Sequence, residues 1–522
     1  MHSEKYDYVV IGSGFGGSVA ALRLAEKGYK VLVIEKGKWY HTKDFPKTNM
    51  NLKKWLWLPS MRFFGFFKLT FLRHVGILSG VGVGGGSLVY ANTLPVPKPT
   101  FFSTGSWSKL KDWESTLEPF YHKARMMLGV TPNPNLGSSD LALQDLSVKI
   151  GRNNLFEPTD VAIFFGKANE TVKDPYFNGK GPDRSGCTFC GACMTGCREN
   201  AKNTLDKNYL HLAQQFDCKI VSEQEVYKIE PLDETGNSGY TVHYKNSTRF
   251  FKKKKSVTAS AVVFAGGVLG TVKLLHQLKK TTMPGLSDQI GRDIRTNNES
   301  LIGLPSLSND KDYTTGIAIG SILHTDKDSH LEPVRYGKGS VFWRFMMLPM
   351  THGKNIFTRI FNLFWALVKS PLRHARILTM WKFSTKTPIL LFMQHLDSTL
   401  QFKPGLLGLQ SRLQKGAAPT ADNPTAKKLA GEYAEITNSE PYVTLPESLL
   451  GIPTTAHILG GAVMGDSIKD GVIDRNNRVF GYDNLWVCDG SMISANPGVN
   501  PSLTITAISE YAMGQIPDKD VL

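Results

Sequence analysis

The sequence contains few cysteines and no long apolar stretch. Six cysteines among 522 residues are too few for the disulfide framework of a small secreted protein. No run of about 18 consecutive apolar residues occurs, so a membrane-spanning helix is not expected. The first residues include Glu4 and Asp7 and lack the apolar core of a secretory signal. A cytoplasmic location is therefore expected.

Acidic residues are also scarce, with 45 Asp and Glu against 61 Lys and Arg. Residues 45–78 and 341–383 contain no acid but hold six and seven basic residues and eight and nine aromatic residues, respectively. Such segments are typical of a surface that meets anionic lipid, and they predict peripheral contact with a membrane. Residues 355–370 have apolar side chains at helical spacing, which predicts an amphipathic helix that lies on the lipid or packs on the core. No nucleic-acid recognition motif is present, so nucleic acid is not expected as a partner.

The composition, 41% hydrophobic and 20% charged, is that of a folded globular protein. Its N-terminus has the pattern strand, glycine-rich turn, helix, strand and acid over residues 6–35. Gly12 permits the tight turn, Gly14 lets backbone N–H groups approach a pyrophosphate, and Gly17 lets the helix pack on the sheet. Glu35 is predicted to accept hydrogen bonds from an adenosine ribose. The pattern predicts a dinucleotide site but does not distinguish FAD from NAD.

A second glycine-rich segment, GVGVGGGSLVYAN over residues 80–92, favours FAD. Three successive glycines let a backbone lie against a flat ring system without intervening Cβ atoms. Nicotinamide-binding folds rarely need a second loop of this kind. The cofactor-binding residues predicted in this segment are Gly84, Gly85, Gly86, Ser87 and Asn92.

Five segments in the expected order resemble the glucose-methanol-choline (GMC) flavin oxidoreductases, and in particular their cholesterol-oxidase-like branch. They are residues 12–18, 82–95, 263–276, 454–465 and 481–510. The resemblance implies an α/β fold in which a discontinuous, Rossmann-like FAD-binding domain joins a substrate domain built on a mostly antiparallel sheet.

The resemblance also implies a division of the chain. The FAD-binding domain is assigned to residues 1–45, 75–100, 200–300 and 455–522. The substrate domain is assigned to residues 101–199, which include a cysteine loop at 187–197, and to residues 301–454. Residues 46–74 are expected to cover the flavin and to face lipid.

In the resembling enzymes, a histidine and an asparagine that match His457 and Asn500 face the flavin and bind the substrate hydroxyl. The histidine helps to remove the hydroxyl proton; the alternative for His457 is an ordinary buried histidine. Asp489 and Gly490 match the pair that contacts the flavin ribityl–phosphate region, and their alternative is a turn-forming Asp-Gly pair.

Asn500 and Pro501 are predicted to open a helix that extends to about residue 516, with Asn500 as its N-cap. The positive end of this helix would face the flavin pyrimidine and stabilise the anion formed on reduction. Cholesterol oxidases also use a glutamate to move a steroid double bond. Glu299 and Asp397 are candidates for that carboxylate, with a surface or structural role as the alternative.

Four cysteines, Cys187, Cys190, Cys193 and Cys197, follow the spacing of the bacterial ferredoxin run, except that Arg198 replaces the usual proline. Three alternatives remain open: an iron–sulfur cluster, a structural zinc site, and free or paired thiols. Some GMC sugar dehydrogenases contain an iron–sulfur centre, so the resemblance is compatible with the first. A cluster would favour a protein or quinone as electron acceptor, and its absence would favour oxygen.

The leading hypothesis is an FAD-dependent enzyme that oxidises the CH–OH group of a lipophilic, sterol-like alcohol to a ketone by hydride transfer to flavin N5. One alternative is a GMC sugar or polyol dehydrogenase that passes electrons through an iron–sulfur cluster. The other is a non-catalytic flavin or iron–sulfur electron carrier.

Overall fold

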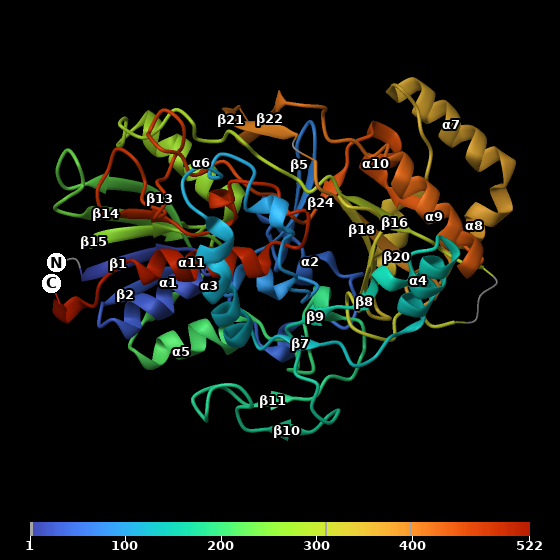
Figure 1. Ribbon diagram of the computed structural model, residues 1–522, viewed down its shortest axis with the longest axis horizontal. Coiled ribbons are helices and arrows are strands. Elements are labelled where there is room, and N and C mark those ends of the chain that lie inside the picture. The colour runs from blue at the N-terminus through green and yellow to red at the C-terminus, as the bar shows by residue number, and fades with distance from the viewer. Residues whose placement is uncertain (1–3, 308–310, 397, 407, 522) are drawn as a thin grey trace.

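A sheet of seven strands is assembled from segments that lie far apart in the sequence (Figure 1). The computed structural model describes residues 4–307, 311–396, 398–406 and 408–521. The strand order is β12-β2-β1-β15-β14-β13, and β25 pairs with the end of β15. Strands β12, β2, β1, β15 and β25 are parallel, whereas β14 and β13 form an antiparallel extension. The bounds are β1 (Lys5–Ile11), β2 (Val31–Ile34), β12 (Lys219–Val221), β13 (Gln224–Pro231), β14 (Tyr240–Asn246), β15 (Lys254–Phe264) and β25 (Leu485–Val487).

The helices that follow these strands pack against one another as well as on the sheet. Helix α1 contacts α5 and α11, and α11 contacts α3, while α6 contacts β13. Glu510 joins three of them, because its carboxylate accepts hydrogen bonds from Arg23 of α1 at 2.8 Å and from Tyr209 of α5 at 2.7 Å. The bounds are α1 (Phe15–Glu26), α3 (Trp113–Leu128), α5 (Tyr209–Gln215), α6 (Gly267–Lys280) and α11 (Ser502–Gly514).

A second sheet of seven strands is antiparallel throughout, in the order β19-β23-β16-β20-β18-β17-β8. Side chains alternate between its faces: Leu390 and Phe392 pack under two helices, α4 and α9, whereas Leu391 points to the opposite face. The bounds are β8 (Phe156–Pro158), β16 (Ser300–Gly303), β17 (Ser321–His324), β18 (Ser329–Val334), β19 (Met347–Pro349), β20 (Ile389–Gln394), β23 (Tyr442–Thr444), α4 (Ser138–Lys149) and α9 (Pro424–Thr437). The predicted combination of a Rossmann-like part with a mostly antiparallel sheet is therefore confirmed.

The cover segment, residues 46–74, packs into the protein. Its aromatic side chains Trp55, Trp57, Phe66 and Phe67 are buried. Trp55, Phe66 and Phe67 belong to an apolar cluster that also includes Leu88 of the second glycine loop. The burial of these four side chains does not support the expectation that the segment faces lipid, although Phe71 and Met61 of the same segment are exposed. The elements here are α2 (Leu52–Trp55), β3 (Trp57–Leu58), β4 (Phe63–Phe64), β5 (Phe67–Phe71), β6 (Gly76–Gly80) and β24 (Thr454–Thr455).

A pair of helices stands at the edge of the second sheet, at the upper right of Figure 1. Helix α7 (Ile356–Lys369) confirms that residues 355–370 are helical, and α8 (Pro371–Thr379) follows directly. No helix among the described residues has the length and apolar character that crossing a membrane requires. The remaining elements are α10 (Leu445–Leu450), β7 (Thr131–Pro132), β9 (Asp160–Val161), β10 (Thr171–Val172), β11 (Arg184–Ser185), β21 (Thr399–Gly405) and β22 (Gly408–Lys415).

Candidate active site

A cavity of about 530 Å³ runs between the two sheets. The first glycine turn and Glu35 line one end, and His457 and Asn500 line the other. The second glycine loop contributes Gly85 and Gly86 to the wall between these ends. The cavity therefore joins the predicted nucleotide-binding residues and the predicted catalytic pair in one continuous space.

The first glycine turn leaves room where a cofactor phosphate would lie. Gly12 has φ +100°, and a Cβ at this position would lie 2.3 Å from the carbonyl oxygen of Ala265. A Cβ at Gly17 would lie 2.2 Å from the carbonyl oxygen of Gly12, so this glycine allows the tight packing that the sequence predicts. Gly14 differs, because a Cβ there would meet no atom within 4 Å, and it lines the cavity. The open side of Gly14 thus faces the space for the ligand.

Only part of the second glycine loop reaches the cavity. Gly85 and Gly86 line it, but Gly84, Ser87 and Asn92 do not. The Ser87 hydroxyl donates to the Gly84 carbonyl oxygen at 2.6 Å and accepts from the Leu205 N–H at 3.1 Å. Asn92 is buried with φ +72°. The prediction that Gly84, Ser87 and Asn92 contact the cofactor is therefore not supported, since these residues shape the loop behind the cavity wall.

Two buried carboxylates line the cofactor half of the cavity. Glu35 accepts hydrogen bonds from the Ser13 hydroxyl and the Gly37 N–H, both at 2.8 Å, which fixes it at the carboxyl end of β2. Asp489 follows β25 and accepts from the Gly267 N–H at 2.9 Å and from the Ser491 N–H at 2.8 Å. Burial raises the pKa of Asp489, and these hydrogen bonds oppose the rise. Gly490 lines the cavity beside it.

The N-terminus of α11 also opens on the cavity, but Asn500 is not its cap. The structure places Pro501 at the N-cap, and the first intrahelical bond runs from the Ile505 N–H to the Pro501 carbonyl at 2.9 Å. The N–H groups of residues 502–504 therefore have no partner within the helix. Asn500 lines the cavity, and its Oδ1 is buried without a hydrogen-bond partner among the described residues.

His457 is held in one orientation by a buried glutamate. Its Nδ1 lies 2.7 Å from Oε1 of Glu299, which also accepts from the Thr455 hydroxyl at 2.7 Å. The other oxygen of Glu299 accepts from the Ala456 N–H at 2.9 Å. Glu299 thus engages the His457 ring at Nδ1, and Nε2 makes no hydrogen bond with the described residues. Glu299 therefore has a structural role, one of the two roles considered for it, because it orients His457 inside the site. Asp397, the other candidate, lies outside the described residues.

A second buried glutamate, Glu332 on β18, was missed by the sequence reasoning. Its side chain is fully buried, and burial raises its pKa to about 8; contact with Asn500 opposes the rise and nearby Glu299 adds to it. The available signal was a carboxylate inside a short run, SHLEPV, that is otherwise suited to a buried strand. The neighbouring His330 has its pKa lowered to about 3 by burial, so both groups are neutral at pH 7.

The far end of the cavity is apolar. Leu301, Ile319, Val334 and Leu391 line it from the second sheet, and Met194 lines it from the cysteine loop. These side chains belong to the face of the second sheet that α4 and α9 leave uncovered. The surface beside His457 is therefore suited to a hydrocarbon skeleton rather than to a polyhydroxylated sugar.

The four clustered cysteines do not form a metal site. Over the parts of the chain that the structure describes, which include all four, no group of three or more His, Cys, Asp or Glu side chains converges to hold a metal ion. Cys190 is exposed, in a bridge to Gly316, while Cys187 and Cys193 are buried in an apolar cluster. Burial raises the pKa of both buried thiols, to about 11 for Cys193. The predicted iron–sulfur or zinc centre is therefore not supported.

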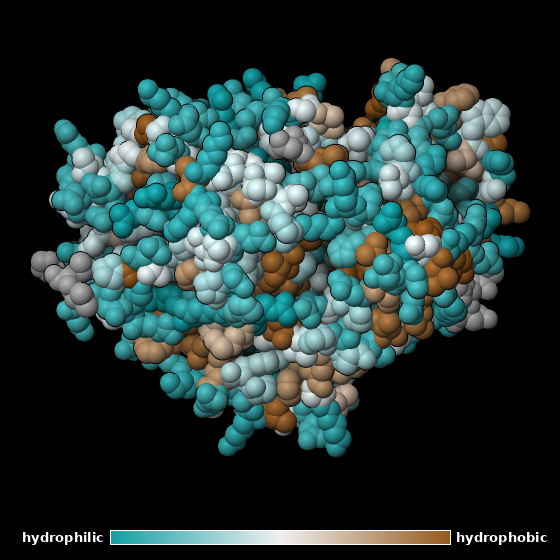
Figure 2. Space-filling view, in the orientation of Figure 1, coloured by the Kyte–Doolittle hydropathy of each residue, from teal (hydrophilic) through white to brown (hydrophobic). Residues whose placement is uncertain are grey.

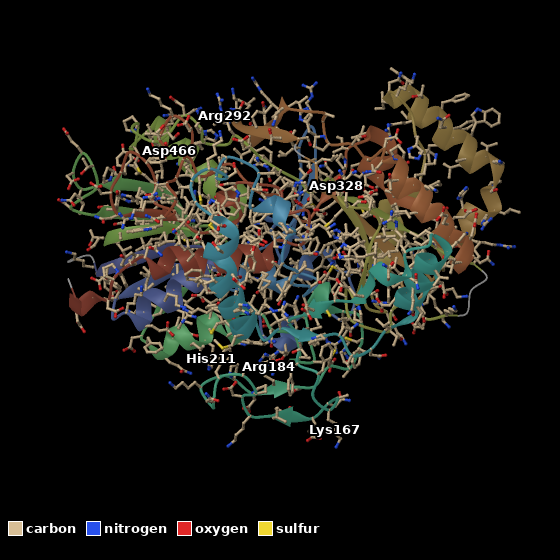
Figure 3. All side chains as sticks on the ribbon, in the orientation of Figure 1. Lys167, Arg184, His211, Arg292, Asp328 and Asp466 are labelled. Atoms are coloured by element: carbon tan, nitrogen blue, oxygen red, sulfur yellow. The ribbon has the colours of Figure 1, made fainter. Side chains whose placement is uncertain are left out.

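Instead of a metal, two basic side chains hold the cysteine loop. Lys202 is buried and donates to the carbonyl oxygens of Leu88, Tyr90 and Cys193 at 3.1, 2.9 and 2.8 Å. Burial lowers its pKa to about 7. Arg184, labelled in Figure 3, donates to the Lys202 carbonyl at 2.8 Å. These bonds fasten the cysteine loop to the second glycine loop.

Comparison with known proteins agrees with this geometry. Family models described as GMC oxidoreductase match residues 176–281 and 416–509, and an FAD-binding-domain model matches residues 7–42. The chain belongs to the GMC oxidoreductase family, as the five matching segments predict, and it is an FAD-dependent enzyme that acts on CH–OH groups.

Among its relatives, a cholesterol oxidase of Acinetobacter baumannii is 43% identical over 537 residues, which cover all of this chain and 96% of that protein. A cholesterol oxidase of Mycobacterium tuberculosis is 41% identical, with 98% of this chain and 91% of that protein covered. The crystal structure of pyridoxine 4-oxidase from Mesorbium loti shares the fold, with a TM-score of 0.61 and 14% identity over 98% of both chains.

The residues present fit FAD. The open side of Gly14 and the free N–H groups at the start of α11 suit a phosphate and a reduced, anionic ring, and Glu35 lies where a ribose would bind. When bound there, FAD supplies a two-electron acceptor for hydride.

Gly14→Ala tests this assignment without measuring activity. The apoprotein is expected to keep its Tm, because the new methyl group meets no protein atom within 4 Å. FAD binding is expected to weaken by about 2 kcal/mol, or roughly 30-fold in Kd, because the methyl group occupies the phosphate space. Flavin fluorescence titration measures the affinity. Gly431→Ala on α9, also with no atom within 4 Å, is the control, and equal affinities in both variants would contradict the assignment.

Proposed function

We propose that the enzyme oxidises the secondary CH–OH group of a lipophilic, sterol-like alcohol to a ketone. The single observation that carries this proposal is His457, whose Nδ1 is held by Glu299 and which lines the same cavity as the apolar side chains of the second sheet. The similarity to the two cholesterol oxidases supports the same substrate class.

In the proposed reaction, the substrate hydroxyl donates its hydrogen bond to Nε2 of His457. The proton would move to Nε2 as the carbon–hydrogen bond breaks, which leaves a carbonyl, and FAD, when bound, would supply the two-electron acceptor for the hydride. Glu299 then stabilises the imidazolium through the bond at Nδ1.

Asn500 and Glu332 act on the substrate oxygen in this proposal. Glu332 is buried beside Asn500 and holds that side chain at the cavity. In this proposal the Asn500 N–H groups donate to the hydroxyl and then to the carbonyl oxygen. The start of α11 adds positive potential on the same side.

We also propose that oxygen accepts the electrons and that the enzyme works at a membrane surface. The two relatives named above are cholesterol oxidases, and this similarity supports oxygen as the acceptor. A sterol-like alcohol is dissolved in lipid rather than in water, and a chain with net charge +16 is attracted to anionic lipid.

Oxygen uptake with three substrates tests the proposal: cholesterol in detergent micelles, a long-chain primary alcohol and glucose. Uptake with cholesterol at a kcat/KM at least about 100-fold above the other two is expected, because the apolar end complements a rigid hydrocarbon skeleton. Turnover of glucose with a dye acceptor, but none of cholesterol, would contradict it and favour the sugar dehydrogenase.

A further inference from the structure

Helix α7 packs with its apolar face toward solvent. Its buried side chains are Arg359 and Leu363, at 7% and 8% exposure. The guanidinium of Arg359 donates to the carbonyl of Glu447 in α10 at 3.2 Å. The exposed side chains are those of its apolar stripe: Ile356, Phe357 (80%), Ile360, Phe361 (60%), Phe364 (58%), Trp365 (54%) and Val368. A helix that packed on the core would show the opposite arrangement.

The exposed apolar surface continues onto α8 and the segment after it. Leu372 and Trp381 are 76% and 80% exposed. The ring of His374 lies 3.1 Å from the carbonyl oxygen of Ala366, which ties α8 to α7. Asn355 caps α7 by accepting from the Thr358 N–H at 2.9 Å. We call α7, α8 and Trp381 the hairpin. Both of its helices are folded in a single copy of the chain. Figure 2 shows hydrophobic side chains at this edge.

Positive charge surrounds the apolar face of the hairpin. Residues 341–383 contain no acidic side chain. Arg373 pairs with Glu440 at 2.8 Å. Four other cations make no ion pair with any residue that the structure describes, and these are Lys354, Lys369, Arg376 and Lys382. A second copy of this chain would bring the same charges against them, whereas anionic headgroups complement them.

We propose that the hairpin is the membrane anchor of the enzyme: its apolar face enters the interfacial layer of an anionic bilayer, and its lysines and arginines contact lipid headgroups. A ring of cations around exposed aromatic and aliphatic side chains is the pattern of a helix that lies in the plane of a membrane. The other basic aromatic segment, residues 46–74, takes no such part, because its tryptophans are buried.

A buried apolar cluster links the base of the hairpin to the wall of the cavity. Ile377 and Met380, at the end of α8, belong to the same apolar cluster as Tyr336, Val334 and Leu391, and these last three line the cavity. An anchor at the hairpin therefore places this side of the cavity next to the bilayer from which the alcohol would come. This last step rests on the proposed function, whereas membrane attachment does not.

Flotation of the purified holoenzyme with vesicles tests the anchor. The vesicles are phosphatidylcholine alone, or phosphatidylcholine with one third phosphatidylglycerol. Wild type is expected to float with the anionic vesicles at low salt and to bind neutral vesicles at least about tenfold more weakly. The variant Phe357→Gln/Phe361→Gln/Trp365→Gln is expected to partition onto anionic vesicles at least about tenfold more weakly than wild type. Its substitutions remove exposed apolar area, whereas glutamine is compatible with the helix.

A matched control uses another exposed aromatic pair beside lysines. Phe250 and Phe251, 76% and 85% exposed, precede Lys252–Lys255. The variant Phe250→Gln/Phe251→Gln is expected to float like wild type. Wild type that does not float with anionic vesicles, a hairpin variant that floats like wild type, or hairpin-mediated dimers in light scattering would each overturn the proposal.

Activity separates this proposal from the proposed function. With cholesterol in detergent micelles, the hairpin variant is expected to keep wild-type kcat, since its substitutions lie on the surface, and with cholesterol in anionic vesicles its rate is expected to fall in proportion to binding. If wild type floats but oxidises no alcohol, the proposed function fails and the anchor stands.

Discussion

Replacing His457 by glutamine is expected to lower kcat with cholesterol about 10³-fold while FAD stays bound. Glutamine can still contact the hydroxyl, but it has no basic nitrogen to take the proton. The hydride is then expelled from a neutral alcohol rather than from one that is losing its proton. Stopped-flow reduction of the flavin under anaerobic conditions measures this step directly.

His276→Gln is the matched control for this experiment. The ring of His276, on α6, lies 3.0 Å from the carbonyl oxygen of Phe402 and does not line the cavity. Glutamine can donate to the same carbonyl, so this variant should reduce its flavin at the wild-type rate. If His457→Gln reduced its flavin within a factor of ten of wild type, the histidine would not be the base, and a non-catalytic electron carrier would become the better hypothesis.

Replacing Glu299 by glutamine is expected to lower kcat about 10²- to 10⁴-fold with little change in KM. The carboxylate accepts three hydrogen bonds, from Thr455, Ala456 and His457. An amide has one oxygen and one NH₂ group, so at least one of these donors would face another donor. The histidine then loses its orientation and the charge that stabilises the imidazolium.

Glu447→Gln provides the comparison, because this glutamate is equally buried and accepts from the Thr454 N–H at 3.0 Å. Burial raises the pKa of Glu447 to about 8, so it is mostly protonated at pH 7 and an amide resembles that form. Its variant should keep kcat within a factor of about three and lose little stability. Equal losses in both variants would show that Glu299 acts only through folding.

The nucleotide half of the fold was predictable because its signals are local. Gly12 and Gly17 occur at the spacing of one turn and the helix that follows, so the motif identifies them, although the atom that excludes a side chain at Gly12 is the carbonyl oxygen of the distant Ala265. Helix α7 was predictable for the same reason, and its ends agree with the predicted range to within one residue. The periodicity of a helix identifies its faces but not the one that packs. The sequence therefore could not show that Arg359 would point inward.

The catalytic neighbourhood was only partly predictable because it depends on register between distant strands. Glu299 precedes β16, Glu332 lies on β18, and both meet loops from the nucleotide-binding part. Nothing near either glutamate in the sequence indicates those partners. The cysteine spacing predicts a metal centre that no group of described side chains supports, because spacing does not state how the loop folds around its thiols.

Strand β25 pairs with β15, which in turn pairs with β1, so the central sheet is completed by residues from near both ends of the chain. The same late segment carries Asp489 and α11, and hence one wall of the flavin pocket. During synthesis, the ribosome therefore releases nearly the whole polypeptide before a cofactor can be enclosed. A nascent chain that stops before Leu485 is expected to expose the edge of β15 and to depend on chaperones rather than on flavin for protection.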